Sequence, residues 1–313
     1  MQVPAAVEYE KATSVDHALA LLARYGPVAR ILAGGHSLIP MMKLRLVQPE
    51  VLVDVNGLDG LSYIDLDGAG TLRIGALTRH ADLLASDLAG EHFAILHDAE
   101  RVIADPIVRN WGTIGGSLCQ ADPSEDLSAA FAAMKGSMVI RGSDGTREVS
   151  AREFHTGPYE TVIGPAEMLT EIRLPVHRGG GSAYLKVSRR AGDWPVGAAG
   201  AAVWLSPEGG PEERVIADAG IGLAALGARH FVAAEAEEFL LGRPPTDEVL
   251  ARAGEIAAGH CQPVTDQRGP ADYKRHLAAE LTTRVLRQAV NRGTGNRGTG
   301  NRGTGNRGTG QPE

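Results

Sequence analysis

Two glycine pairs, each next to small hydroxyl residues, are the features of this sequence that could do chemistry. AGGHS spans residues 33–37, and TIGGS spans residues 113–117. Each follows an apolar stretch, at a point where a strand would end or a helix would begin. Glycines leave backbone N–H groups open to an anion, and nearby hydroxyl groups add hydrogen-bond donors. Two such loops some 80 residues apart indicate one extended diphosphate held between two subdomains.

Neither loop matches the common phosphate-binding motifs. No Gly-Lys-Ser/Thr follows, as it would in a P-loop, and neither loop reads G-x-G-x-x-G. A nucleoside triphosphatase and an ordinary Rossmann dehydrogenase are therefore disfavoured. For either loop taken alone, a structural Gly-Gly turn remains the competing interpretation.

The elements that position the first loop form a small β-α-β unit over residues 1–57. Ser14 is expected to cap a helix that runs through Tyr25. A short strand over residues 28–33 then leads into the loop, and a second strand is expected over residues 51–55. The first loop would thus lie at the end of a buried strand.

The second loop lies in a longer region over residues 58–176. Thr78 is expected to cap one helix, and another is expected over residues 93–104, ending before a proline. The loop leads to a helix from about Asp126. SMVIRG, REVSAREF and MLTEIRLP are expected to be strands of a mostly antiparallel sheet.

The glycine-rich segment HRGGGS at residues 177–182 indicates a boundary before a C-terminal α+β domain, which we assign to residues 177–290. Its strands are followed by two helices near residues 247–258 and 273–290. Four copies of NRGTG come next and contain nothing apolar to bury, so residues 291–313 are predicted to be a disordered tail.

The overall composition narrows the classes of partner. The chain has 313 residues and a net charge of −7, and its last 23 residues carry +3, which leaves about −10 on the rest. An acidic body argues against nucleic acid as a partner. No apolar run approaches the roughly 20 residues that span a bilayer, so no transmembrane segment is expected. The N-terminal residues do not resemble a signal peptide.

The cysteine count limits the metal chemistry of the chain. Two cysteines are too few for a disulfide framework, and too few to hold an iron–sulfur cluster alone. No His, Cys or carboxylate grouping has metal-ligand spacing, so no metal site is expected. A cytoplasmic location is the simplest interpretation.

Long stretches around both loops resemble a known family. LAGGHSLIPMMKLRL and IADPIVRNWGTIGGSLCQADPSEDLSA resemble the FAD-binding medium subunit of molybdenum hydroxylases, which include carbon monoxide dehydrogenase and xanthine dehydrogenase. YLKVSRRAGDWPVGAAGAAV and DQRGPADYKRHLAAELTTRVL resemble the carbon monoxide dehydrogenase branch. The resemblance runs to about residue 290. It implies an α+β, vanillyl-alcohol-oxidase-type (PCMH) FAD-binding fold in two subdomains plus a C-terminal α+β domain.

The resemblance also implies which residues contact FAD. The positions that would line the diphosphate are Ala33, Gly34, Gly35, His36 and Ser37 from the first loop, and Thr113, Gly115, Gly116 and Ser117 from the second. The positions that would contact the ribityl, ribose, adenine or isoalloxazine parts are Gln120, Asp126, Leu169, Lys186, Arg190, Asp193 and Trp194. Some of these side chains could instead have a purely structural role. Asp126 suits the first turn of a helix, Lys186 and Arg190 suit an exposed strand end, and Trp194 suits a hydrophobic core.

The function implied by the resemblance is electron transfer. A large molybdopterin subunit would oxidise the substrate, a small subunit with [2Fe-2S] clusters would relay electrons, and FAD here would pass them to a quinone, NAD or oxygen. A dimer of heterotrimers is expected, and no catalytic acid or base in this chain. Two alternatives are a stand-alone flavin oxidoreductase with its own substrate pocket, and a non-enzymatic nucleotide-binding or scaffold protein without flavin.

Overall fold

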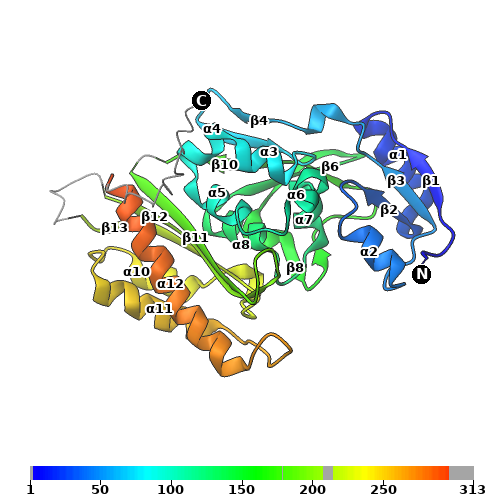
Figure 1. Ribbon diagram of the computed structural model, residues 1–313. Coiled ribbons are helices and arrows are strands. Elements are labelled where there is room, and N and C mark those ends of the chain that lie inside the picture. The colour runs from blue at the N-terminus through cyan, green and yellow to red at the C-terminus, as the bar shows by residue number, and fades with distance from the viewer. Residues whose placement is uncertain (1–2, 178, 207–213, 296–313) are drawn as a thin grey trace, which may run out of the picture.

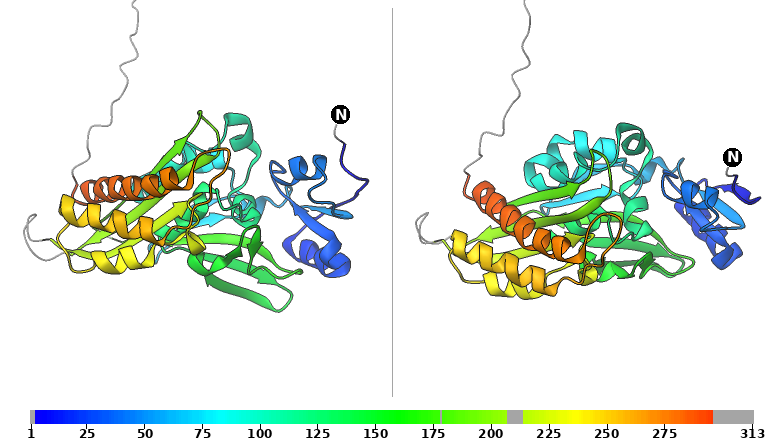
Figure 2. Two further views of the ribbon diagram at one scale, coloured as in Figure 1. Left: turned by 90° about the horizontal axis from the view of Figure 1, so that it is seen from below. Right: turned by 60° about the horizontal axis from the view of Figure 1, so that its bottom comes forward.

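A computed structural model describes residues 3–177, 179–206 and 214–295 of the protein, and Figure 1 shows them as sheets with helices packed between and over them. A small N-terminal lobe lies at one end of the molecule. The two last helices, α11 (Asp247–His260) and α12 (Ala271–Gly293), cover a sheet at the other end (Figure 2). Both glycine loops lie where the small lobe meets the middle of the molecule (Figure 1).

The N-terminal lobe is a parallel sheet of order β1-β3-β2 with a covering helix. Ser14 caps that helix by accepting a hydrogen bond from the N–H of His17 (3.0 Å), as expected. The apolar side chains of Leu19 and Leu22 pack on the sheet beside Val53. The elements are β1 (Glu8–Lys11), α1 (Val15–Tyr25), a 3-10 turn (Gly26–Val28), β2 (Ala29–Leu32), α2 (Leu38–Lys43), β3 (Val51–Asp54) and a second 3-10 turn (Asp59–Leu61).

The middle region is built on an antiparallel sheet of order β4-β5-β10-β6-β7. Its strands are β4 (Ile64–Leu66), β5 (Thr71–Gly75), β6 (Ser137–Gly142), β7 (Gly145–Ser150) and β10 (Met168–Pro175), with a separate pair β8 (His155–Gly157) and β9 (Glu160–Thr161). Its helices are α3 (His80–Ala85), α4 (Asp87–His92), α5 (Ala94–Glu100), α6 (Pro106–Trp111), α7 (Ile114–Gln120), α8 (Asp126–Ala133) and α9 (Ala151–Phe154).

Several sequence expectations for this region were wrong in detail. Thr78 does not cap a helix, because its hydroxyl bonds both the N–H and the carbonyl of Tyr63 (3.2 and 2.9 Å) and α3 begins two residues later. The helix expected over 93–104 ends at Glu100. The segment expected to be one strand, REVSAREF, turns into helix α9 after Ser150. The expected antiparallel pairing of β6, β7 and β10 is confirmed.

The C-terminal sheet is packed on both faces, and its central strand is rich in glycine and alanine. Strand β12 (Pro195–Leu205) lies between β11 (Gly180–Ser188) and β13 (Ile216–Ala224). Since side chains alternate along a strand, Ala198 and Ala202 face the core of the middle region, while Ala199 and Ala201 face the C-terminal helices. A short 3-10 turn (Arg229–Phe231) and α10 (Ala234–Leu240) complete this part.

Helix α8 rests directly on this sheet. A Cβ atom at Gly220 or Gly222 of β13 would overlap the carbonyl oxygens of Ala133 or Ala129, so only glycine permits this approach. The middle region and the C-terminal sheet therefore share one core. The domain limits at residues 57, 176 and 290 remain predictions.

Helix α12 extends into the segment expected to be a tail. It ends at Gly293, and the Arg292 guanidinium bonds the carboxylate of Asp98 (2.5 Å) and the carbonyl of Ser182 (2.6 Å). The first NRGTG copy is thus partly helical and anchored. The remainder of the predicted tail, residues 296–313, lies outside the described residues.

Candidate functional site

The first glycine loop joins β2 to α2 and presents backbone donors. Gly35 has φ of +74°, a left-handed conformation that suits glycine. Within the described residues, the N–H groups of residues 34–38 have no hydrogen-bond partner. The carbonyl of Ala33 is held by the side-chain amide of Asn56 (2.7 Å). His36 is exposed and Ser37 is half-buried. The loop is therefore a fixed bend whose N–H groups are available to an anion.

The second glycine loop uses its N–H groups internally. Gly115 donates to the carbonyl of Ala76 (2.8 Å), and Gly116 donates to the hydroxyl of Thr113 (3.1 Å). A Cβ at Gly115 would lie 2.7 Å from Ala76, so glycine is needed here for packing against the end of β5. The open amide donors expected at both loops are thus seen only at the first. The second loop offers the hydroxyl of Ser117 instead.

The first loop packs against the residues that lead into the second loop. A Cβ at Gly34 would overlap the carbonyl oxygen of Trp111, just before the second loop. Further along, the side-chain amide of Gln120 on α7 lies 3.2 Å from the sulfur of Met41 on α2. The loops from two separate sheets therefore border one junction, as the diphosphate hypothesis requires.

Arg79 and Asn56 fasten this junction, and the sequence patterns did not reveal either of them. Arg79 donates hydrogen bonds to the carbonyl of Trp111 and to the amide oxygen of Asn56 (3.0 Å). The amide N–H of Asn56 in turn donates to the carbonyl of Ala33. The clamp places a guanidinium beside both loops. The only available signal was a cation that directly follows a strand end, which is common at protein surfaces.

A buried ion pair connects two of the predicted flavin contacts. Lys186 donates to the carboxylate of Asp126 (2.8 Å) and to the carbonyl of Val102 (3.1 Å), and Tyr184 donates to the other oxygen of Asp126 (2.7 Å). Burial raises the pKa of Asp126, although the neighbouring Lys186 charge opposes that shift. The positive charge of Lys186, which the resemblance places near the isoalloxazine, is thus paired with the carboxylate of Asp126.

The remaining predicted contacts fall in two places. Arg190, Asp193 and Trp194 lie together on the loop between β11 and β12, where Arg190 is 83% and Trp194 45% exposed. One carboxylate oxygen of Asp193 is buried without a hydrogen-bond partner in the described structure. Leu169 is instead buried in the core of the middle region, at a bulge in β10.

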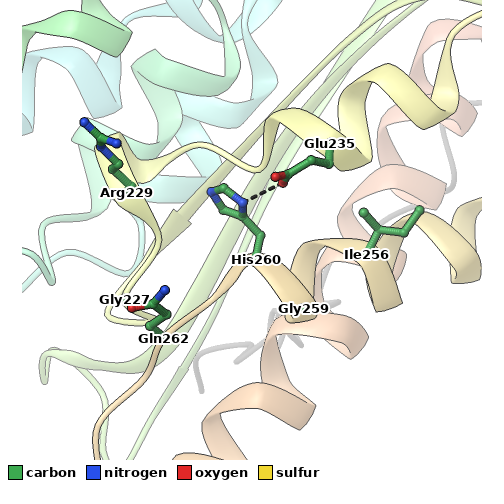
Figure 3. Close-up of a pocket in the computed structure, with 7 residues that line it drawn as sticks. All are labelled: Gly227, Arg229, Glu235, Ile256, Gly259, His260 and Gln262. Carbon is green, nitrogen blue, oxygen red and sulfur yellow. Dashed lines mark ion pairs between the residues drawn. The ribbon is translucent and has the colours of Figure 1, made fainter.

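Two pockets of the described structure lie away from these residues. Figure 3 shows one formed by α10, α11 and the segment after β13, where His260 points toward Glu235 and pairs with it at 2.5 Å. The second lies on the five-stranded sheet and is lined by charged side chains such as Arg73 and Glu148. Neither pocket includes a predicted flavin contact.

The described ranges contain neither a cluster of possible metal ligands nor a helix able to span a membrane. Among those residues, no group of three or more His, Cys, Asp or Glu side chains is placed to hold a metal ion. No helix in the same ranges combines the length and the apolar character needed to cross a membrane.

Comparison with known proteins places the chain in a family. Residues 5–177 match the family described as "FAD binding domain in molybdopterin dehydrogenase", and residues 182–289 match "CO dehydrogenase flavoprotein C-terminal domain". The chain is 38% identical to the carbon monoxide dehydrogenase medium chain of Hydrogenophaga pseudoflava, over 92% of this chain and 98% of that one. It is 34% identical to the glyceraldehyde dehydrogenase medium chain of Sulfolobus acidocaldarius, over 91% and 99%.

The fold is shared with a solved structure of the same kind. A chain of reconstituted CO dehydrogenase from Oligotropha carboxidovorans superposes with a TM-score of 0.87 at 37% identity, covering 93% of this chain and 99% of that chain. The α+β fold class expected from the sequence, an FAD-binding part followed by a C-terminal domain, is thereby confirmed.

Proposed function

The chain belongs to the FAD-binding family of molybdopterin dehydrogenases, and we propose that it holds FAD at the junction of its two glycine loops within a carbon monoxide dehydrogenase-type complex. The N–H groups of residues 34–38 are donors without partners in the described structure, so they fit an anionic diphosphate. The hydroxyl of Ser117 faces the same diphosphate from the second loop. The guanidinium of Arg79 adds positive charge at the junction of the two loops.

The other parts of the cofactor follow from the elements around the junction. We assign Gln120 and Asp126 to its ribityl or ribose side. We assign Lys186 and the loop carrying Arg190, Asp193 and Trp194 to its isoalloxazine side. The exposed ring of Trp194 can cover a ring face. The Asp193 carboxylate oxygen that accepts no hydrogen bond lies 3.7 and 3.8 Å from the guanidinium groups of Arg189 and Arg190, and it can accept from a cofactor N–H. Leu169 contributes from the core and supports the strand beneath.

When bound, FAD supplies the redox chemistry, taking electrons from [2Fe-2S] clusters of a small subunit and giving them to an external acceptor such as a quinone, NAD or oxygen. The residues of this chain bind and orient the cofactor and tune the charge around it. A large molybdenum-cofactor subunit and a small iron–sulfur subunit are the proposed partners, in a dimer of heterotrimers. We propose that the complex is located in the cytoplasm.

Substrate choice is assigned to the large subunit. Similar subunits, 31–38% identical to this chain, belong to enzymes named for carbon monoxide, glyceraldehyde, 6-hydroxypseudooxynicotine and nicotine. Because the same kind of subunit accompanies such different substrates, this chain is proposed to take no part in recognising them.

The observation that carries this proposal is the close packing of the first loop against Trp111 and Gly112, just before the second loop, where glycine is required at position 34. The test is to purify the full chain with the proteins that accompany it and to measure flavin, molybdenum and iron. One FAD per chain, with molybdenum and iron in the accompanying subunits, is the expected result. A complex that stays colourless after incubation with FAD would contradict the proposal. Substrate-dependent flavin reduction by the chain alone would favour a stand-alone oxidoreductase instead.

A further inference from the structure

A chain of three polar side chains leads from the interior to the second glycine loop. Nδ1 of His80 lies 3.0 Å from a carboxylate oxygen of Glu100, and its Nε2 lies 2.8 Å from the hydroxyl oxygen of Ser117. His80 and Glu100 are 2% and 0% exposed. Ser117 is half-buried next to the exposed Gly116. The three groups thus connect a sealed ion pair with a hydroxyl at the proposed cofactor site.

The imidazole is fixed against the loop that it serves. The N–H of His80 donates to the carbonyl of Gly112 (3.2 Å), and a Cβ at Gly112 would lie 2.9 Å from the His80 ring. Neighbouring Thr78 accepts a hydrogen bond from the N–H of Ile114 (2.9 Å). The ring therefore has little freedom to turn away from Ser117.

Charged groups around His80 favour its protonated form. Burial by itself lowers the pKa of His80, but the charge and hydrogen bond of Glu100 outweigh burial and raise that pKa. Glu125 raises the His80 pKa further and Arg109 lowers it. Burial raises the pKa of Glu100, and Asp126 adds to that effect. These are the charged groups that face the pair from α5, α6 and the start of α8.

We propose that His80 is a positioning residue whose proton sets the direction of the Ser117 hydroxyl, an inference that rests on the proposed FAD site. When both ring nitrogens carry hydrogen, Nε2–H donates to Oγ of Ser117. The hydroxyl hydrogen is then free to donate to an oxygen of the diphosphate. When Nε2 loses its proton, the Ser117 hydroxyl donates to Nε2 instead, and the diphosphate loses that donor.

This arrangement makes FAD affinity depend on pH with a definite sign. Affinity should be full while His80 is protonated and should fall as pH rises through the His80 pKa, which lies above the ordinary histidine value. Hydrogen bonds to charged groups contribute enough for a loss of roughly tenfold. Arginine and backbone donors keep their hydrogens throughout. The pKa values of the nearby Glu125 and Asp126 are also raised, so the Ser117→Ala variant is needed to separate the hydroxyl effect from the ionisation of these carboxyl groups.

The test uses the full chain together with the subunits that accompany it. Flavin is removed with a chaotropic salt, and the Kd for added FAD is measured by fluorescence quenching from pH 6 to 9.5. ADP-ribose serves as a second probe, because it carries the diphosphate without a titratable flavin ring. The unmodified protein should bind both probes roughly tenfold more weakly at the highest pH.

Two variants should flatten the pH profile at opposite levels. Ser117→Ala lacks the hydroxyl and should bind FAD at all pH values as weakly as the unmodified protein does at high pH. The double variant His80→Gln/Glu100→Gln presents a permanent amide donor to Ser117 without an unpaired charge. It should bind as tightly at all pH values as the unmodified protein does at low pH. Melting temperatures measured in parallel identify a folding defect in the double variant.

Specific outcomes overturn the inference. It fails if the unmodified protein binds ADP-ribose equally well from pH 6 to 9.5, or if Ser117→Ala keeps the slope. In either case FAD still binds, and the proposed function stands. If the unmodified protein binds neither probe at any pH, the proposed function itself fails and this inference falls with it.

Discussion

The two glycine loops share a sequence pattern and differ in where their N–H groups point. In the first loop, the N–H groups of residues 34–38 have no partner in the described part of the chain. In the second loop, Gly115 and Gly116 donate to Ala76 and Thr113. Paired glycines thus serve two different purposes here. One pair leaves its donors without partners, and the other allows close packing beside a side-chain hydroxyl that we propose faces the ligand.

Gly34→Ala is expected to have the largest effect on FAD binding. The new Cβ would collide with the carbonyl of Trp111 and push the two loops apart. Backbone atoms cannot rotate out of the way as a side chain can, so affinity should fall at least roughly 100-fold. Flavin content after gel filtration measures this. Gly68→Ala is the control, since a Cβ there meets nothing within 4 Å, and equal flavin loss in both variants would contradict the argument.

Gly115→Ala should act on stability more than on affinity. Its Cβ would lie 2.7 Å from Ala76 and crowd the end of β5. Overpacking of this kind costs about 1–3 kcal/mol. Thermal unfolding without flavin should show the loss, with FAD affinity weakened less than in Gly34→Ala. A variant with normal melting temperature and no FAD binding would place Gly115 among the direct cofactor contacts instead.

Ser37→Ala and Thr113→Val form a matched pair that separates the loops further. The Ser37 hydroxyl makes no helix-capping bond, so its loss should weaken FAD binding by roughly tenfold without changing stability. The Thr113 hydroxyl caps α7, so its loss should cost about 1 kcal/mol of stability with little change in affinity. Isothermal titration and chemical unfolding of both variants measure the two quantities. Reversed outcomes would refute the division between the loops.

Glu125→Gln should leave FAD affinity at low pH unchanged and should alter the pH dependence of stability. Because Glu125 also raises the His80 pKa, the fall of FAD affinity with pH should begin at a lower pH in this variant. The carboxylate bonds the N–H groups of Leu127 and Ser128 at the start of α8, and burial raises its pKa to about 7 from the ordinary 4.5. Between these values the folded state binds more protons, so the unfolding free energy falls as pH rises. The glutamine variant should lose this part of the slope between pH 5 and 7.5 in urea unfolding. An unchanged slope would show that Glu125 is not its source.

The elements that could be predicted from the sequence were those with local signals. Ser14 and Gly26 mark the limits of α1, and the paired glycines mark both loops. The contacts between distant residues could not be predicted, since no local pattern brings Asn56 to Arg79, or Asp126 to Lys186. Strand β1 was missed because its sequence, EYEK, is polar and is stabilised by pairing with β3 rather than by burial.

The candidate site could likewise be predicted only in part from the sequence. The diglycine loops were recognised from their sequence pattern, but the hydrogen bond of Gly115 depends on Ala76 at the end of β5, which is distant in the sequence. The triad of Glu100, His80 and Ser117 comes from three helices far apart in the sequence, and no spacing signals it. Residues that act through a distant partner become visible only when the chain is folded.

The hydrogen bonds of Arg292 to Asp98 and to the Ser182 carbonyl set a limit beyond which shortening the C-terminal end would break a contact of the folded body. A version that ends at residue 295 keeps the last turn of α12 tied to α5 and β11, whereas one that ends at residue 290 frees an aspartate beneath it. Affinity tags or fluorescent fusions attached after residue 295 would therefore leave the hydrogen bonds of Arg292 in place.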